Sequence, residues 1–377
     1  MSQNPKIAIM ILNYNGLRWL PKCLASVTRT DYPNYDVYLI DNGSVDRSID
    51  YVTQNFPSVK IIRNDKNLGF AEAYARAIDS VDADQVLLLN NDTEVLNPRW
   101  VKSLVKKANN PGVAAVNCKM VSMKNYSILD SIGGMGVPFW RGFVDIGKGE
   151  ADVRQYDSET IEPFAFCGGA ALINVSAFKK AKGFDRKLFS YFEDVDLSWR
   201  LRLLGYRIEY SPDATVAHFL GGSSVGPNKS NVFYYCHRNL LRTIIKNCGW
   251  TFKWAFVNYL LYSTIIMGLG SIAFRPTLPG KVLRGILWNI YNFRDTYRQR
   301  LLIQANRHRQ EEEILDGMFP NLPRHQSSES HILRVMNILF ESSQRQRFEK
   351  LKHKVTEQTI RWRDNEKCGT MKLDHLN

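Results

Sequence analysis

The chain has 377 residues, of which 44% are hydrophobic and 12% aromatic. This apolar content is enough for a sizeable packed core, which excludes a globally disordered protein, and the length exceeds that of a single small binding module. The net charge of +13 is uneven, because residues 231–377 carry 23 basic and 12 acidic side chains whereas residues 1–230 are close to neutral. Basic segments of this kind meet nucleic acid or anionic membrane surfaces.

The cysteines and the N-terminus indicate in which cellular compartment the protein is expected. The six cysteines are widely spaced and include no Cys-x-x-Cys pair, so the sequence signals neither a zinc site nor a disulfide framework. Residues 1–6 lead directly into a short apolar run and lack the features of a secretory signal. We therefore expect a reducing, cytoplasmic environment.

Short apolar runs alternate with segments long enough for helices from residue 6 onward. Four of these runs, rich in β-branched residues and leucine, are expected to be strands buried on both faces, at residues 6–12, 37–41, 59–62 and 86–90. Repeated strand–helix units predict an α/β fold with a mostly parallel sheet flanked by helices. In such sheets ligands bind beyond the carboxyl ends of the strands.

Polar residues follow each of these predicted strands, in segments 13–16, 41–44, 64–69 and 90–92. Turn chemistry explains part of this pattern, because Asn, Asp and Gly are common in tight loops. Four such loops on one predicted edge of the sheet favour a binding site there.

The next part of the chain is less regular. Residues 122–162 contain many glycines and are expected to be loop-like, and residues 166–175 are expected to form a strand. A helix is predicted from Glu193, since apolar residues recur every four positions and Gly205 would end it. Glu193 and Asp194 would then lie in its first turn, where a helix favours carboxylates.

Residues 254–274 contain no charged side chain, a length sufficient to cross a bilayer. Internal polar residues and flanking basic residues favour instead a helix that lies on the membrane interface. A spanning helix and an ordinary buried helix remain alternatives at this point.

Several motifs that would indicate other functions are missing or out of place. The sequence has no P-loop, no His-Glu-x-x-His pair and no Gly-x-Ser-x-Gly elbow. The glycine pattern at residues 268–273 lies inside the apolar run, where a dinucleotide loop is not expected. No recognisable RNA-binding module is present, so we expect no nucleic-acid partner.

What remains is a set of acidic residues with metal-site character. Asp92 follows the most apolar strand, and its carboxylate suits Mg²⁺ or Mn²⁺, although a helix cap is the alternative. His218 ends a second apolar stretch and could reach the same cation. A carboxylate such as Glu193 or Asp194 could take a proton from a hydroxyl group during group transfer, or merely occupy a helix start.

Seven segments, in this order, resemble glycosyltransferase family 2 in its rhamnosyltransferase-like branch. They are ILNYN (11–15), IDNGSVD (40–46), NLGFA (67–71), LLNNDTEV (88–95), FCGGAALI (166–173), FSYFEDVDLSWRLRLLGY (189–206) and AHFLGGSS (217–224). The resemblance covers about residues 6–245 and implies a GT-A fold, a mostly parallel sheet flanked by helices. Residues 1–230 would form the catalytic domain, residues 231–310 a helical, basic and membrane-associating segment, and residues 311–377 a polar, charged tail.

The resemblance also implies an activity. This would be inverting transfer of a sugar from dTDP-rhamnose or a UDP-sugar to a hydroxyl of a glycan or lipid-linked acceptor, in cell-wall or polysaccharide biosynthesis. The expected place is the inner face of the cell membrane. Asp194 would be the general base and Glu193 would help to position the acceptor, while Asp92 and His218 would bind Mg²⁺ or Mn²⁺.

The same resemblance implies a nucleotide pocket. Asp41 would bind the base, the side chains of Asn13 and Asn15 would line the pocket, and the backbone at Asn67 and Gly69 would approach the donor. Asn90, Asn91 and Asp92 occupy the family's Asp-x-Asp position, so we expect Asp41, Asp92, Asp194 and His218 to converge on one cleft.

Two alternatives stay open. Asn90 stands where the family pattern has an aspartate, and an amide is the weaker cation ligand. This keeps open an inactive glycan-binding or scaffold protein on the same fold. A nucleotidyltransferase would also use an α/β sheet and acidic metal ligands, but it would not require the Glu193–Asp194 helix start.

Overall fold

The computed structural model describes residues 4–137, 142–157, 161–219, 231–272 and 277–318, which lie within one compact unit, residues 1–325. The main sheet contains β1 (Ile7–Asn13), β2 (Tyr35–Asp41), β3 (Lys60–Arg63), β4 (Gln85–Asn90), β5 (Thr93–Val95), β6 (Val113–Ser122), β7 (Asn125–Ser131), β10 (Ala170–Asn174) and β11 (Arg207–His218). Its order is β3-β2-β1-β4-β10-β6-β11-β5, with β7 paired to β6.

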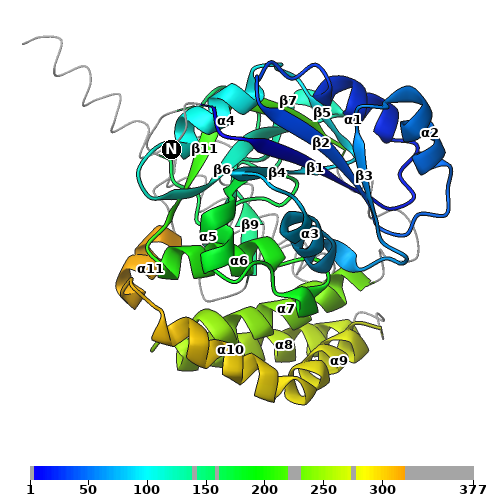
Figure 1. Ribbon diagram of the computed structural model, residues 1–377. Helices are drawn as coiled ribbons and strands as arrows, with labels where there is room; N and C mark the ends of the chain where they lie inside the picture. The colour runs from blue at the N-terminus through cyan, green and yellow to red at the C-terminus, as the bar shows by residue number, and fades with distance from the viewer. Residues whose placement is uncertain (1–3, 138–141, 158–160, 220–230, 273–276, 319–377) are drawn as a thin grey trace, which may run out of the picture. The chain divides into compact units, whose positions relative to one another are not determined.

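Helices cover both faces of this sheet (Figure 1). They are α1 (Leu20–Val27), α2 (Ser48–Asn55), α3 (Gly69–Ser80), α4 (Trp100–Ala108), α5 (Val175–Lys180) and α6 (Glu193–Leu203), with a short 3₁₀ turn, η2 (Arg186–Leu188), before α6. The C-terminal helices are α7 (Val232–Asn247), α8 (Phe252–Ile272), α9 (Thr277–Tyr291), α10 (Phe293–Ala305) and α11 (Glu311–Met318).

The first half of the sheet is parallel, as the sequence predicts. β1 pairs in parallel with both β2 and β4, and β2 pairs in parallel with β3. Their carboxyl ends therefore meet at one edge, and the polar segments that follow β1, β2 and β4 lie together there. The fold class expected from the sequence is confirmed in this half.

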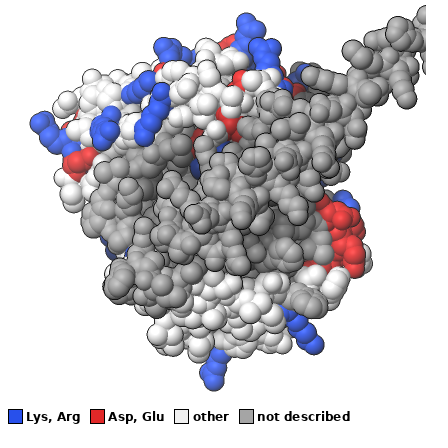
Figure 2. Space-filling view, turned by 180° about the vertical axis from the view of Figure 1, so that it is seen from behind, with Lys and Arg blue, Asp and Glu red and all other residues white. Residues whose placement is uncertain are grey.

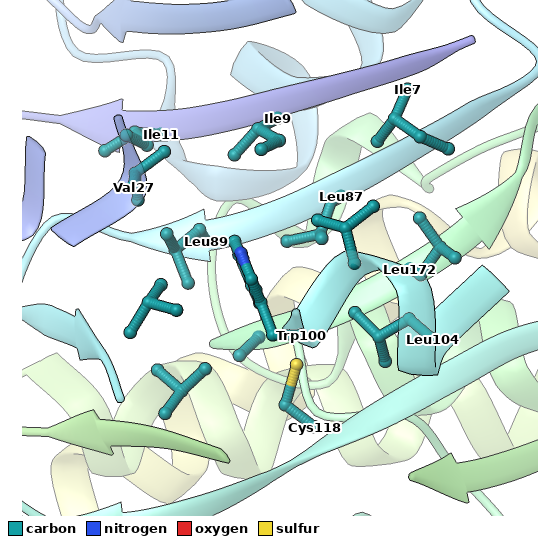
Figure 3. Packing of buried hydrophobic residues seen from close by; sticks show 14 of the residues in the cluster. Ile7, Ile9, Ile11, Val27, Leu87, Leu89, Trp100, Leu104, Cys118 and Leu172 are labelled. Carbon is teal, nitrogen blue, oxygen red and sulfur yellow. The ribbon is translucent and has the colours of Figure 1, made fainter. Parts of the chain in front are cut away.

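Alternation along β1 divides the core into two layers. Ile7, Ile9 and Ile11 point to the face covered by α1 and α4, where they pack with Leu87 and Trp100 (Figure 3). Ala8 and Met10 point to the other face, which α3, α5 and α6 cover. Successive strand side chains face opposite sides, so a continuous apolar run is what a sheet buried on both faces requires.

The second half of the sheet is mixed. β10 runs antiparallel between β4 and β6, whereas β11 is parallel to β6. The expectation that residues 122–162 are loop-like is wrong, because this segment contains β7 and a second small sheet of β8 (Gly134–Val137) and β9 (Gly142–Asp145). Its glycines serve close packing, as at Gly133, where an added Cβ would lie 2.5 Å from Pro163.

The C-terminal helices pack against α6 of the α/β part instead of standing apart from it. Trp199 and Leu203 of α6 share an apolar cluster with Leu240 and Ile244 of α7 and Tyr259 of α8. Helices α8, α9 and α10 each contact α7 and form the lower layer in Figure 1. Within the described ranges, no helix is both long and apolar enough to cross a membrane.

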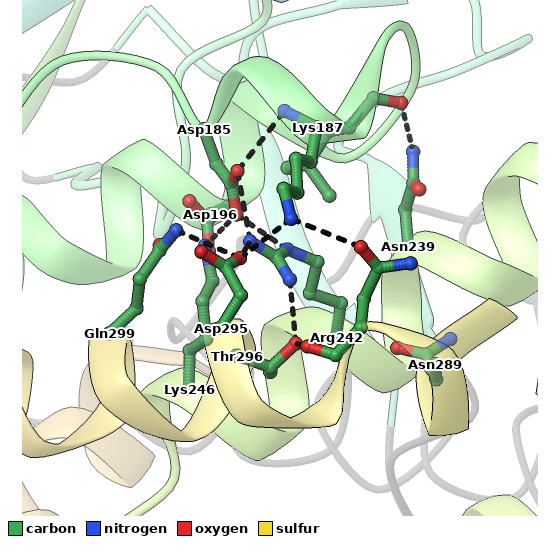
Figure 4. A network of polar contacts seen from close by, with 12 residues as sticks. Asp185, Lys187, Asp196, Asn239, Arg242, Lys246, Asn289, Asp295, Thr296 and Gln299 are labelled. Carbon is green, nitrogen blue, oxygen red and sulfur yellow. Dashed lines mark hydrogen bonds and ion pairs between the residues drawn. The ribbon is translucent and has the colours of Figure 1, made fainter.

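A buried network of charges joins α7 to the segment before α6 (Figure 4). Arg242 donates a hydrogen bond to Asp185 at 2.7 Å, and Lys246 binds both Asp185 at 2.5 Å and Asp196 at 2.8 Å. Burial raises the pKa of Asp185, but the charges of Lys246 and Arg242 outweigh this and hold it well below its usual range. The network thus stays ionised and fixes α7 against η2 and α6.

Candidate active site

A cavity of about 340 Å³ opens at the carboxyl edge of the parallel strands. Its walls come from the loops after β1, β2 and β4, the start of α3, the turn before β10, the segment before α6, the end of β11 and one residue of α7. The lining residues are Leu12, Tyr14, Asn42, Asn67, Gly69, Phe70, Asn90, Asn91, Gly168, Gly169, Phe189, Ser190, Tyr191, Glu193, Asp194, His218 and Tyr235.

Most of the residues that the sequence nominated meet here. Seven of them line the cavity, namely Asn67, Gly69, Asn90, Asn91, Glu193, Asp194 and His218. Asp92 does not line it but contacts His218, whose Nε2 lies 3.4 Å from Asp92 Oδ1. Asn13, Asn15 and Asp41 do not line it: Asn13 is bonded to the lining residue Asn91, whereas the side chains of Asn15 and Asp41 contact the loop after β2.

The Asn13 side chain fixes the loop after β4. Its Oδ1 accepts a hydrogen bond from Asn91 Nδ2 at 2.8 Å, and its Nδ2 donates to the hydroxyls of Ser44 and Ser48. Asn13 is fully buried, and a Cβ at Gly16 would lie 2.3 Å from its Oδ1. Gly16 is therefore required for the Asn13–Asn91 pair to form.

Asp41 and Asn15 shape the turn after β2. Asp41 is 5% exposed and its Oδ1 accepts a hydrogen bond from the Ser44 amide at 3.3 Å. Asn15 adopts a φ of 51°, and its Oδ1 accepts a hydrogen bond from the Val45 amide at 2.8 Å. The structure thus gives both residues a role in the loop, and their binding to a nucleotide stays a prediction.

Asn42, which the sequence analysis did not nominate, organises the start of α3. Its Nδ2 donates to Asn67 Oδ1 and to the Gly69 carbonyl, both at 3.1 Å, and its Oδ1 accepts from the Leu68 amide. Gly69 has a φ of 77°, and an added Cβ would lie 2.4 Å from the Phe189 carbonyl oxygen. Only glycine permits this close approach between α3 and the segment before α6.

Asp92 and His218 form the most unusual polar pair at the cavity. Asp92 is 1% exposed, and no hydrogen bond reaches either of its carboxylate oxygens. The other ring nitrogen of His218, Nδ1, lies 2.6 Å from Asp130 Oδ2. Burial lowers the pKa of His218, but the carboxylates of Asp130 and Asp92 outweigh this and raise it to about 9.

A buried carboxylate without hydrogen bonds is costly unless a cation or another ligand satisfies it. The Asp92 oxygens therefore fit a divalent cation, for which carboxylate oxygen is a suitable ligand. Across the described residues, no group of three or more His, Cys, Asp or Glu side chains is arranged to hold a metal ion by itself. A cation here would need further ligands from a bound substrate.

Asp194 has the properties of a general base. It is partly buried at the cavity wall, and its carboxylate accepts hydrogen bonds from the amides of Gly168 at 3.0 Å and Val195 at 2.8 Å. Burial raises its pKa, these amides lower it, and the nearby charge of Asp145 raises it again, to about 6. A carboxylate with this pKa is ionised at neutral pH and is still basic enough to accept a proton.

Glu193 differs from its neighbour because it is 5% exposed. Burial, followed by the charge of Asp194, raises the pKa of Glu193 well above its usual value. Its Oε2 is buried without a hydrogen-bond partner. A protonated Glu193 could therefore donate a hydrogen bond to a group bound in the cavity.

The sequence analysis missed the aromatic wall of the cavity. Phe189 stacks on Tyr235 of α7 with ring centroids 5.2 Å apart, and Phe70 of α3 lines the same space. It also missed Asp130, whose surrounding sequence carries no recognisable signal. The basic residues of α7 did carry a signal, since Arg238, Arg242 and Lys246 recur every four positions along the helix.

Comparison with known proteins agrees with this geometry. Residues 8–181 match the family model of glycosyl transferase family 2. A relative from Mycobacterium tuberculosis (strain CDC 1551 / Oshkosh), N-acetylglucosaminyl-diphospho-decaprenol L-rhamnosyltransferase, is 26% identical over 65% of this chain and 86% of its own length.

Two solved structures are similar in fold. S. aureus TarS 1–349 in complex with UDP-GlcNAc aligns with a TM-score of 0.51 and 15% identity over 83% of this chain and 89% of its own. GalNAc-T7 with UDP, GalNAc and Mn²⁺ aligns with a TM-score of 0.52 and 17% identity over 65% of this chain and 48% of its own. The architecture of this chain is therefore the GT-A type that the sequence predicted.

Proposed function

We propose that this chain is a member of glycosyl transferase family 2, whose model matches residues 8–181, and that it transfers a sugar from a nucleotide-diphosphate donor to a hydroxyl group of a glycan or lipid-linked acceptor. The observation that carries this proposal is the cavity itself. It combines a carboxylate of pKa about 6, Asp194, with the Asp92–His218 pair at one edge of the sheet. The name of the M. tuberculosis relative and the ligand of the TarS structure make dTDP-rhamnose or a UDP-sugar the donors to test.

Asp194 is the proposed base. The acceptor oxygen attacks the anomeric carbon on the side opposite the nucleotide, while the bond from that carbon to the diphosphate breaks. This attack from the opposite face inverts the anomeric configuration, and the Asp194 carboxylate takes the hydroxyl proton. Glu193, whose pKa burial raises, would position the acceptor through its carboxyl group.

On the donor side, the two buried oxygens of Asp92 and Nε2 of His218 would hold Mg²⁺ or Mn²⁺ together with the diphosphate. When bound, such a cation offsets the charge that develops on the departing diphosphate. Because His218 must be neutral to bind it, loading the site would release a proton. Asp41, Asn13 and Asn15 would hold the nucleotide loop, with Asn67, Gly69, Asn90 and Asn91 facing the donor.

The C-terminal helices support action on a lipid-linked acceptor. Each of α8, α9 and α10 exposes apolar side chains at helical spacing on the side away from α7: Val257, Leu261, Ile265, Leu283, Leu287, Ile290, Phe293, Tyr297 and Leu301. Basic side chains are exposed on the same helices, and α8 and α9 contain no acidic residue. Figure 2 shows a largely uncharged lower surface with projecting basic groups.

This combination suits the anionic surface of a membrane, which binds both apolar and basic side chains. We therefore propose peripheral binding at the cytoplasmic face. The described cysteines, Cys23, Cys118, Cys167, Cys236 and Cys248, are all free thiols, which fits a reducing compartment.

A thermal-shift screen of nucleotide sugars, each with and without Mn²⁺, tests the proposal. Binding to the folded protein raises its melting temperature, so one donor should stabilise it clearly more when metal is present. Donor binding without transfer to any acceptor would favour the scaffold alternative that Asn90 keeps open. Stabilisation by nucleoside triphosphates alone, with pyrophosphate release, would favour a nucleotidyltransferase.

A further inference from the structure

The segment between η2 and α6, residues 189–192, forms part of the cavity wall in an unfavourable backbone conformation. Phe189, Tyr191 and Phe192 have φ values of 67°, 71° and 69°, although none is glycine. Phe189 has a ψ of −71°, and the Ser190 amide donates a hydrogen bond to the Leu188 carbonyl at 2.8 Å. This is a classic γ-turn, which is rare and strained. Such a conformation persists only where surrounding groups hold it.

Side chains of α7 supply most of that support. Asn239 Nδ2 lies 2.9 Å from the Leu188 carbonyl, 3.0 Å from that of Ser190 and 2.6 Å from that of Tyr191, and it donates hydrogen bonds to this group of three oxygens. Arg238 donates to the Lys187 and Leu188 carbonyls. Figure 4 shows Asn239 directed toward this segment from α7.

The remaining carbonyls are bound by neighbouring helices. The Phe189 oxygen accepts hydrogen bonds from the amides of Phe70 and Ala71 at the start of α3. The Phe192 oxygen accepts one from the Asp196 amide in α6. Each of the six backbone carbonyls from residue 187 to 192 thus accepts a hydrogen bond from α7, α3 or α6. The Asn239 side chain alone binds three of them.

Asn239 is itself fixed. It is completely buried, and its Oδ1 accepts a hydrogen bond from Arg238 Nε at 2.8 Å. This bond sets the orientation of the amide, so that its nitrogen faces the three carbonyls. An aspartate of the same shape would place an acceptor oxygen against them.

The held segment leads directly into the reactive residues. Phe189, Ser190 and Tyr191 line the cavity, and Glu193 and Asp194 begin the helix that follows. We propose that Asn239 is a positioning residue for sugar transfer, which fixes residues 188–192 and thereby the place of Asp194 relative to the bound substrates. This inference rests on the proposed function, and it assigns to α7 a role that the sequence predictions gave only to residues before 231.

Substitution of Asn239 by Ser or Asp tests this role against a matched control on α9. Asn289 is also buried, and its Nδ2 donates to two backbone carbonyls, of Arg238 and Gly285, but to none in residues 187–192. We expect Asn239→Ser to lower kcat at least about tenfold with the donor KM changed less than about threefold, since binding survives while placement of the base is lost. Asn289→Ser should leave kcat within about twofold at a similar loss of thermal stability.

Chymotrypsin provides a readout that needs no enzyme activity, because Phe189, Tyr191 and Phe192 are potential cleavage sites. The wild-type protein should resist cleavage in this segment, and Asn239→Ser should be cut there at least about tenfold faster with no change at other sites. Rapid wild-type cleavage here, or equal kcat losses in Asn239→Ser and Asn289→Ser, would overturn the inference. If both Asn239 variants fail to fold, Arg238→Gln, which removes the bond that orients the Asn239 amide, takes their place in both measurements. A wild-type protein that transfers no sugar but resists cleavage would refute the proposed function alone.

Discussion

Burial gives Asp194 its chemistry. An exposed aspartate would be ionised but too weakly basic near neutral pH, whereas partial enclosure beside Gly168 raises its pKa to about 6. Two amide hydrogen bonds keep the carboxylate from losing its charge altogether. Asp194 can therefore stay ionised at neutral pH and still accept a proton from a hydroxyl group.

The pH profile of transfer should report this pKa. Because the base must be ionised, kcat with donor and metal already bound should be constant above about pH 7 and should fall about tenfold per unit well below pH 6. Steady-state rates with saturating acceptor would show it, with donor affinity measured at each pH as the control. A flat profile between about pH 5 and pH 8 would exclude Asp194 as the group that titrates.

Asp92 should separate metal binding from folding. Asp92→Asn removes one of the two carboxylates that raise the pKa of His218, so the free energy of unfolding without metal should fall by about 1 kcal/mol at neutral pH. Mn²⁺-dependent stabilisation by the donor should disappear.

Asn90→Asp supplies the carboxylate that the family pattern has at this position, and Mn²⁺ titrations should show tighter binding. Unchanged metal dependence in both variants would remove this pair from the donor site.

At the residue scale, the sequence indicated the residues that line the cavity better than the residues that hold them in place. Residues at strand ends, such as Asn90 and Asp92, are identifiable because parallel strands bring their carboxyl ends together. Asp130 and Asn239 act through contacts across 88 and about 50 positions. No local pattern encodes such pairings, so only the folded chain reveals them.

Helix α7 links the C-terminal part of the chain to the reactive residues. Arg242 is fully buried, and it donates hydrogen bonds to Asp185, Asp295 and Thr296. Loss of one partner in a buried ionic network leaves charges uncompensated. Arg242→Met should therefore lower the free energy of unfolding by about 3 kcal/mol, as chemical denaturation would measure.

Arg294 provides the control because it is exposed on α10. Arg294→Met should change the free energy of unfolding by no more than about 0.5 kcal/mol. If Arg242→Met changed the free energy of unfolding as little as Arg294→Met, the buried ionic network would not be what stabilises the position of α7.

The elements that were predictable are those with strong periodicity. The continuous apolar runs at β1, β2 and β4 and the four-residue repeat of α6 match the structure, because both patterns follow directly from burial. β7, β8 and β9 were missed, since β8 and β9 are short and contain glycine, and β7 has only two aliphatic residues among polar ones. They pair with the neighbouring strand in the sequence, β7 with β6 and β8 with β9, and strand propensity depends on such partners as much as on the residues themselves.

For the whole molecule, the exposed apolar sides of α8, α9 and α10 should determine where the protein works. The double substitution Leu261→Glu and Leu287→Glu should reduce flotation with phosphatidylglycerol-containing vesicles at least about tenfold. The reason is that two leucines, exposed in the free protein, would no longer be buried in the membrane. Binding of the wild type should weaken as salt rises.

Val153→Glu is the matched control, because Val153 is also about half exposed, at 55%, but lies outside these helices. It should leave flotation unchanged. Equal binding of the wild type to pure phosphatidylcholine vesicles, or none to either kind, would contradict a role for anionic lipid.

The division of the chain at residues 230 and 310 stays a prediction.

Sugar transfer by the purified chain and by Asp194→Asn, measured with a labelled nucleotide sugar, Mn²⁺ and a membrane lipid extract, tests the account most directly. The wild type should label a lipid-linked product, and Asp194→Asn should bind the donor normally yet transfer about a hundredfold to ten-thousandfold more slowly. Transfer by Asp194→Asn at the wild-type rate would contradict the account.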